Sequence, residues 1–599
     1  MAQAIVEKQV EEAPETTVRT RIPYWRKVID QTGITPEVAN YRYSGSGTES
    51  DPFLVQWIPN DPRNPMNLSK ITRWSVTLVA ATTTLAVSLL SSAYTGGIRE
   101  IIHEFEISEE VATLGVSLYV LGFALGPLLW APLSELYGRQ SVFFFTYGAL
   151  TVFSAGCAGA NSATTLIVLR FFAGAFGSSP LSNSGGVVAD IFSDDERGLA
   201  MVLFGAAPSL GPVFGPIVGG FLGVAAGWRW LMGFLAAVAG TFWLLGTVLV
   251  PETYSPYLLR RRAAALSKMT GKCYVSRIEH AKGKVSLAKS FKTALSRPWV
   301  LLLREPIVLL LSVYTAIIYG TLYMLFAAFP IVYQQERGWS PGVGGLPFLS
   351  LMVGMIAAVI YSVPENNRYQ RVQKRNGGRA PPETRLVSVM VGAVAAPVGL
   401  FWFAWTTGPS IHWMASVAAG VPFGFAIILL FIGMINYLVD AYTIFAASVL
   451  AANCVIRSAF GAAFPLFTTY MYKNLGTNWA SSIPAFLALG CVPFPFLFYK
   501  YGAAIRARCK YAAESEAFMS QLMQEDATPN QKEEDGTTTD AILSDTTDVR
   551  TTSDDGSSVH RQSDQRAMSQ ASTRREPYDG HPYDGDLEYT RKDTPEKLK

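Results

Sequence analysis

Two arginines, Arg170 and Arg457, lie inside long apolar stretches of the 599-residue chain. A guanidinium is costly to place in such surroundings, so each arginine is a candidate functional residue. Arg170 could favour the charged form of a nearby carboxylate or hold an anionic group of a substrate. Alternatively, its side chain extends from the start of its helix to a water interface. Arg457 lies nearer the middle of its stretch, where it could support a hydrogen-bonded packing network or line a cavity.

A second group of chemically active residue types stands between two apolar stretches, in the run PLSELYGRQ at residues 132–140. Gly138 permits a tight turn and the close approach of two parts of the chain. Arg139 can form an ion pair with an acid at the end of a neighbouring helix, and Asp190 is the candidate. The alternative is a basic loop that only marks one side of a membrane.

Small residues and prolines alternate in a third segment, GAAPSLGPVFGPIVGG at residues 205–220. Small residues at a spacing of four let two helices approach closely, and prolines bend a helix. Ordinary helix packing accounts for the spacing but not for the repeated Gly-Pro pairs. The residues of interest are Pro208, Gly211, Pro212, Gly215, Pro216, Gly219 and Gly220.

Other kinds of chemistry are not indicated. The five cysteines show no CxxC or Cys/His spacing, so the sequence predicts no metal site and no cofactor. It contains no phosphate-binding GxxxxGK[ST] loop, so we do not expect ATP-driven pumping. No apolar stretch carries a His cluster, paired carboxylates or a nucleophile with its base, so we do not expect an enzyme.

The elements that position these residues are predicted membrane helices. Charged residues make up 16% of the chain, against about 25% in ordinary soluble proteins. This excludes a soluble multi-domain protein, and a net charge of +3 provides no basic surface for nucleic acid. A membrane helix needs about 20 mostly apolar residues. The stretches that qualify are residues 72–93, 111–132, 141–160, 164–188, 199–223, 228–250, 306–332, 344–363, 386–406, 411–435, 444–470 and 482–501.

Lysine and arginine in the loops set the expected orientation. Basic residues concentrate in the loops 252–305 and 364–385, which places these loops and both termini in the cytoplasm. Two six-helix halves are typical of a transporter built from repeated units, whereas an ion channel should show a filter or rings of charge. The predicted parts are a polar tail (1–70), a first half (71–251), a central loop (252–305), a second half (306–503) and a disordered tail (504–599).

Several of these stretches resemble one family. PLSELYGRQ resembles the signature loop Gly-x-x-x-Asp-x-x-Gly-Arg of the major facilitator superfamily, with Glu135 in the place of Asp and Pro132 or Ala131 near the first Gly. RFFAGAFGSS at 170–179 is similar to the arginine motif of its fourth helix, and GPVFGPIVGG at 211–220 to its antiporter motif. With PETYSPYLLRR at 251–261, the pattern resembles the fungal drug:proton antiporter branch with twelve spans. The resemblance covers roughly residues 60–505.

The resemblance implies an all-α integral membrane protein of the major facilitator fold, with twelve transmembrane helices in two six-helix halves. It implies a proton-coupled efflux transporter that exports small, largely apolar toxic compounds (drugs, fungicides or a self-made secondary metabolite) by alternating access. Such a protein would be a monomer of the plasma membrane, with a small-molecule substrate, protons and the lipid bilayer as its partners.

The resemblance also implies roles for single residues. Glu135, Gly138, Arg139 and Asp190 would form a conformational latch, with Glu135 near the N-terminus of a second-half helix. Arg170 and Arg457 would serve proton coupling or substrate binding. Spans 1, 4, 7 and 10 would line a cavity whose aromatic side chains suit large apolar ligands. The cavity candidates are Ser88, Ser91, Phe176, Tyr319, Tyr323, Phe423 and Phe425.

The proton-carrying residue is not assigned, because no Asp or Glu lies deep in spans 1, 2, 7 or 8. The acids at span ends are Glu135, Asp190, Glu252, Glu305 and Asp440. Two other functions stay open: an importer or facilitator of a nutrient or polyamine on the same fold, and a non-transporting membrane sensor. The segment that resembles the antiporter motif disfavours import.

Overall fold

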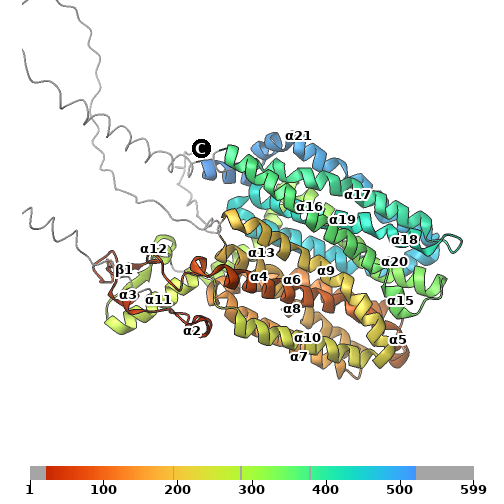
Figure 1. Cartoon of the computed structure of the whole chain (residues 1–599), viewed down its shortest axis with the longest axis horizontal. Helices are drawn as coiled ribbons and strands as arrows, with labels where there is room; N and C mark the ends of the chain where they lie inside the picture. Colours follow the sequence, from red (N-terminus) through yellow and green to blue (C-terminus); the bar gives the residue numbers. More distant parts are fainter. Residues whose placement is uncertain (1–21, 193, 284–285, 377–379, 521–599) are drawn as a thin grey trace, which may run out of the picture.

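Long helices lie side by side in one bundle (Figure 1). The computed structural model describes residues 22–192, 194–283, 286–376 and 380–520. Within them, eleven helical segments are long and apolar enough to cross a membrane. The bundle is all-helical, as the sequence predicts.

Six long helices come from the first half of the chain and the others from the second. The first set is α4 (Lys70–Ala93), α6 (Glu109–Tyr137), α7 (Arg139–Ala158), α8 (Ala163–Ile191), α9 (Asp194–Ala226) and α10 (Trp228–Leu249). The second set is α14 (Pro306–Phe329), α16 (Phe348–Arg375), α17 (Leu386–Thr406), α19 (Gly420–Ala441), α20 (Ala446–Cys491) and α21 (Pro493–Arg508). Shorter helices connect them: α5 (Ile98–Phe105), α15 (Pro341–Gly345) and α18 (Trp413–Ala418).

Local sequence explains where several of these helices begin. The hydroxyls of Ser69, Ser108 and Ser162 each accept a hydrogen bond from the backbone nitrogen three residues later. Such caps satisfy amide groups that the first helical turn leaves without a partner. The apolar runs of α4, α6 and α8 therefore start at defined residues.

The last apolar segment runs over 66 residues, Thr443–Arg508. A straight helix of that length would extend about 100 Å, roughly three times the apolar thickness of a bilayer. Gly476 interrupts it with a φ of 72° and a ψ of 163°, a backbone conformation that only glycine adopts easily. The predicted spans 444–470 and 482–501 lie on either side of this glycine.

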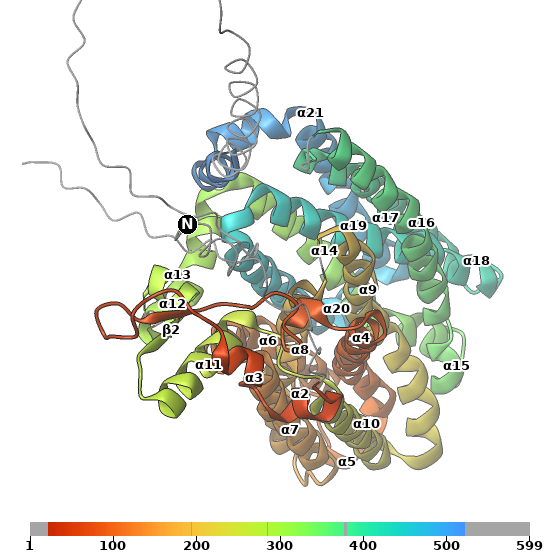
Figure 2. The ribbon, with the colours of Figure 1, turned by 60° about the vertical axis from the view of Figure 1, so that its left-hand side comes forward.

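A small folded unit lies outside the bundle, next to the ends of the first-half helices (Figures 1 and 2). It contains α2 (Tyr24–Ile29), α3 (Pro36–Asn40), α11 (Ser255–Thr270) and α12 (Arg277–Lys282). Strand β1 (Phe53–Val55) pairs in parallel with β2 (Tyr274–Ser276), in the register Phe53↔Tyr274. We call this end of the bundle the basic end and the other the opposite end.

An ion pair between Asp61 and Arg262 ties the two chain segments of this unit together. Their atoms Oδ2 and Nη1 are 2.5 Å apart, and both side chains are fully buried. Arg262 also lies 4.8 Å from the ring of Trp57. The part of the predicted N-terminal tail that the structure describes is therefore folded against the central loop. A sheet of three-residue strands was not expected from the sequence.

The rest of the central loop forms α13 (Leu287–Arg304), which leads into α14. At the other end of the chain, helix continues to residue 520 with one break at Cys509. The helical part thus extends beyond residue 504, where the sequence predicts the start of the tail. Residues 1–21 and 521–599 of the predicted tails lie outside the described residues.

Candidate functional site

The loop between α6 and α7 holds an ion pair at the basic end. Nε of Arg139 donates to Oδ2 of Asp190 at 2.6 Å, and Nη2 donates to Oδ1 at 3.4 Å. The hydroxyl of Thr253 donates to Oδ2 as well, at 3.1 Å. A side chain at Gly186 would overlap the Arg139 guanidinium, so that glycine provides its space. The structure therefore joins α7, α8 and the segment after α10 at one point.

Glu252 is a member of this cluster that the sequence analysis names only as an acid at a span end. Its carboxylate accepts hydrogen bonds from the backbone nitrogens of Arg139 at 3.1 Å and Gln140 at 3.0 Å. It is fully buried, and burial raises the pKa of this carboxyl above its ordinary value although its backbone hydrogen bonds lower it. Gly138 has a φ of 87°, and a side chain there would overlap the Glu252 carboxylate. A carboxylate at the start of α7 also suits the helix dipole.

Glu135 lies on the exposed surface of α6. Its carbonyl oxygen accepts a hydrogen bond from Arg260 of α11 at 2.9 Å. The predicted contact of its side chain with the N-terminus of a second-half helix stays a prediction.

The second half carries a similar ion pair, which was not predicted from the sequence. Nε of Arg385, just before α17, donates to Oδ2 of Asp440 near the end of α19 at 3.0 Å. The hydroxyl of Tyr369 donates to the same oxygen, also at 3.0 Å. Arg139 stands at the start of the third long helix and Asp190 at the end of the fourth. Arg385 and Asp440 hold the corresponding places among the second set of long helices.

Three glycines of the segment 205–220 face α4, namely Gly211, Gly215 and Gly219. A Cβ on Gly211 would lie 2.5 Å from the Leu85 carbonyl oxygen, and one on Gly215 would overlap the Ser92 hydroxyl. A Cβ on Gly219 would overlap the Ala93 carbonyl oxygen, and Ser92 donates to the Pro212 carbonyl at 2.8 Å. Pro208, Pro212 and Pro216 lie inside the continuous helix α9. The two helices can pack this closely only because these glycines have no side chain.

Another part of α9 meets the second half. A Cβ on Gly220 would lie 2.6 Å from the Pro341 carbonyl oxygen, and one on Gly345 would lie 2.7 Å from that of Pro216. Pro341 and Gly345 delimit α15 at the opposite end. The same helix segment therefore packs on α4 within its own half and on α15 across the interface.

Arg170 is buried in the first half, with 3% of its surface exposed. Its guanidinium donates to the carbonyl oxygens of Gly115 at 2.6 Å, Leu90 at 3.3 Å and Ser91 at 3.0 Å. It also lies 4.4 Å from the ring of Tyr94. This placement does not fit a side chain that extends to the water interface. Arg170 connects α4, α6 and α8.

Ser91 and Tyr323 connect the halves near the centre of the bundle. Their hydroxyls are 2.8 Å apart, and the Tyr319 hydroxyl donates to that of Tyr323 at 3.4 Å. Arg457 lies 5.0 Å from the Tyr319 ring and 5.5 Å from Phe431, a residue that the sequence analysis missed. These residues form a central cluster of aromatic rings, hydroxyls and one guanidinium.

Four cavity candidates lie elsewhere. Ser88 packs against Gly211 of α9. Phe176 packs against Trp130 and Phe153 within the first half. Phe425 packs against Tyr361, and Phe423 lies against Gly399, all within the second half. A position near the middle of a helix does not by itself say which face it occupies.

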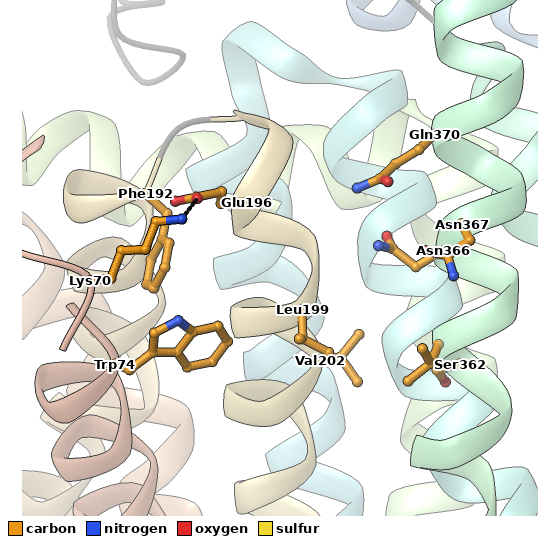
Figure 3. Close-up of a pocket in the computed structure, with 11 residues that line it drawn as sticks. Lys70, Trp74, Phe192, Glu196, Leu199, Val202, Ser362, Asn366, Asn367 and Gln370 are labelled. Atoms are coloured by element: carbon orange, nitrogen blue, oxygen red, sulfur yellow. Dashed lines mark ion pairs between the residues drawn. The ribbon is translucent and has the colours of Figure 1, made fainter.

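A cavity of about 300 Å³ lies between the halves at the basic end, lined by residues of α4, α9 and α16 (Figure 3). Trp74 and Phe192 form an aromatic side, where their ring centroids are 5.4 Å apart. Asn366, Asn367 and Gln370 of α16 present amides from the other half. Lys70 and Glu196 form an ion pair at its rim, 3.8 Å apart. Its volume lies at the lower end of the range of pockets that bind small molecules.

The Major Facilitator Superfamily model matches residues 76–465. The chain belongs to the Major Facilitator Superfamily. It is therefore a membrane transporter by family, and the prediction of a non-enzyme is confirmed.

Relatives and solved structures agree with this membership. The chain is 60% identical over 588 residues to the "Major facilitator superfamily multidrug transporter mdrA" of Aspergillus fumigatus, with 96% of this chain and 97% of that protein covered. It is 61% identical to the "MFS-type efflux pump MFS2" of Trichophyton rubrum and 52% identical to the "Efflux pump FUBT" of Fusarium oxysporum. Each of these matches covers 85% of this chain and 86% of the relative.

Among solved structures, the proton:xylose symporter XylE has a TM-score of 0.52 at 15% identity, with 72% of this chain and 97% of XylE covered. At that identity the likeness shows the fold alone. The predicted superfamily and its fungal efflux branch are thus confirmed by the family match and the relatives.

Proposed function

We propose that this transporter exports small, largely apolar toxic compounds from a fungal cell, in exchange for protons. The similarity to a multidrug transporter over 96% of the chain is the observation that carries the proposal. Drugs, fungicides and self-made secondary metabolites are the expected classes of cargo. The aromatic and hydroxyl groups of the central cluster and the aromatic side of the basic-end cavity suit such ligands.

The proposed topology has twelve crossings in two six-helix halves, within a single monomeric chain. The 66-residue segment Thr443–Arg508 supplies two of the crossings, because it is far too long for one and has a glycine break at Gly476. Among the loops between the long helices, those at the basic end carry most of the Lys and Arg residues, so this end is proposed to face the cytoplasm together with both termini. The plasma membrane is the proposed location.

Alternating access would use the contacts at the two ends of the bundle. At the opposite end, the backbones of α9 and α15 meet through Gly220 and Gly345, which closes the path between the halves on that side. At the basic end, a cavity lies among α4, α9 and α16, beside a contact between Gly198 of α9 and Asn366 of α16. The ion pairs Arg139–Asp190 and Arg385–Asp440 hold the helix ends of each half as rigid units, so that the halves can move as bodies.

The proposal is tested by export from cells with and without the transporter. Cells that express the wild-type chain should accumulate less of a fluorescent apolar dye than cells that lack it. A protonophore should abolish the difference, because the proton gradient drives the exchange. Higher internal dye in expressing cells would mean import instead. Equal accumulation of every dye and metabolite tried, at normal surface expression, would favour a non-transporting sensor.

A further inference from the structure

Arg457 lies at the interface between the halves, in the middle of the bundle. It is eleven residues into α20, which corresponds to about 17 Å of helix, roughly half of a bilayer's apolar thickness. Cys454 donates to the Phe123 carbonyl of the first half, and Gly461 contacts Val120. Positions 454, 457 and 461 share one helical face. Arg457 is therefore on the face of α20 that meets the first half.

The Arg457 guanidinium is poorly satisfied by the protein. Its Nε is buried and has no hydrogen-bond partner among the described residues. Within the described part of the chain, its one side-chain hydrogen bond runs from Nη2 to the Cys454 sulfur, a weak acceptor, at 3.7 Å. The hydroxyl of the next residue, Ser458, is fully buried and also has no partner within the described part of the chain. Two neighbouring hydrogen-bond donors near the middle of the bundle, Arg457 Nε and the Ser458 hydroxyl, are thus without an acceptor in the described part of the chain.

Arg170 differs in this respect. Three backbone carbonyls of its own half accept its hydrogen bonds, so its guanidinium is occupied by the protein. Arg457 makes no such bond to a carbonyl in the described residues. Of these two membrane-depth arginines, Arg457 is the one with donor capacity to spare.

Neither arginine has a carboxylate partner among the described residues, where the resolved ion pairs all lie toward the ends of the bundle or outside it. A cation at this depth is costly without an anion, and proteins pair or neutralise such charges. An anionic ligand would provide the missing charge and the missing acceptors together. A neutral ligand would leave the guanidinium unpaired.

We propose that Arg457 binds the anionic group of the exported compound, and that the preferred cargo is an aromatic organic anion such as a lipophilic carboxylate. The rings of Tyr319 and Phe431 beside the guanidinium would pack against the aromatic part, and Ser458 would donate to the same oxygen atoms. This inference rests on the proposed export function, because it names the charge class of what is exported.

The test measures binding to the purified full-length transporter in lipid nanodiscs. The probes are 1-naphthoate, its neutral isostere 1-naphthamide, and 1-naphthylmethylammonium, compared by titration calorimetry. Wild-type protein should bind naphthoate at least about tenfold more tightly than either of the others, since close charge pairs contribute that much or more. Arg457→Gln should reduce the naphthoate-to-naphthamide ratio of affinities to about one, and Arg457→Lys should retain part of the preference.

Arg229→Gln is the matched control, because Arg229 forms an exposed pair with Glu104 away from the centre. It should keep the wild-type ratio. A wild-type ratio near one, absence of naphthoate binding, or an unchanged ratio in Arg457→Gln would each overturn the inference. Dye export by the same wild-type protein in cells separates this result from the proposed function. A protein that exports the neutral dye but shows no anion preference leaves export standing and removes only the role of Arg457.

Discussion

The carboxylate of Glu252 accepts a hydrogen bond from the backbone nitrogen of Arg139 at 3.1 Å, although 113 residues separate them. The Arg139 side chain at the same time binds Asp190. Arg139 thus binds two carboxylates, that of Glu252 through its backbone nitrogen and that of Asp190 through its side chain. Three distant segments of the first half are fixed at the start of α7 as a result.

Replacing Glu252 by alanine should destabilise the first half. The change leaves the partly buried amides of Arg139 and Gln140 without this acceptor, which costs about 2–3 kcal/mol. The midpoint of thermal unfolding of the purified protein should fall, and dye export should fall with it. Glu365→Gln is the control, since Glu365 forms only a local surface pair with Arg368. Equal midpoints for both variants would contradict the capping role.

The contribution of Glu252 should also depend on pH. Burial raises its pKa in the folded protein above the ordinary value of 4.5, so the folded state binds its proton more readily than the unfolded state. Stability of the wild type relative to Glu252→Ala should therefore increase as pH falls from the raised pKa towards 4.5, and stay constant outside that window. Thermal unfolding of both proteins across this range measures it. A relative stability that decreases on acidification would show a lowered pKa instead.

The contact of α9 with α4 should be sensitive to a single methyl group. Gly215→Ala would place a Cβ onto the Ser92 hydroxyl, so helix separation or misfolding should follow, with export and thermal stability both reduced. Gly233→Ala on α10 is matched, because nothing lies within 4 Å of its Cβ position. That variant should be neutral or stabilised by up to about 1 kcal/mol through helix propensity. Normal export by Gly215→Ala would contradict the close packing of α9 on α4 at this position.

Arg170→Ala should abolish export while the protein still reaches the cell surface. The substitution removes the guanidinium that donates to three carbonyls of α4 and α6. It also removes a positive charge from the interior of the first half. Efflux assays together with surface labelling distinguish loss of transport from loss of protein. Normal transport by this variant would remove Arg170 from the mechanism.

Most of the long helices of the bundle were predictable from the sequence, because charged residues mark the ends of the apolar runs that form them. Apolar runs stop at residues such as Arg139 and Lys70, and most of the long helices begin within about five residues of the expected positions. The exceptions are α19 and α21, which begin nine and eleven residues later than expected. The glycine spacing in α9 likewise predicted close helix contact. These features depend on residues that are near each other in the chain.

Contacts between distant residues were harder to predict. Nothing in the local sequence around Glu252 indicates that it caps a helix 113 residues earlier. Arg385 and Asp440 belong to stretches without the signature loop of the first half, so their pairing was not apparent. Phe176 lies in an expected cavity helix, but its face is set by Trp130 and Phe153, which periodicity alone does not place.

The buried pair Asp61–Arg262 imposes an order on biosynthesis. The two residues are 201 positions apart, and the first-half membrane helices lie between them. At about 5–20 residues per second, a ribosome needs roughly 10–40 s to make the intervening chain. Asp61 and strand β1 must therefore wait, unpaired in the cytosol on the proposed topology, until the first half has entered the membrane and α11 emerges. Closure of this unit would mark the completion of the first half during translation.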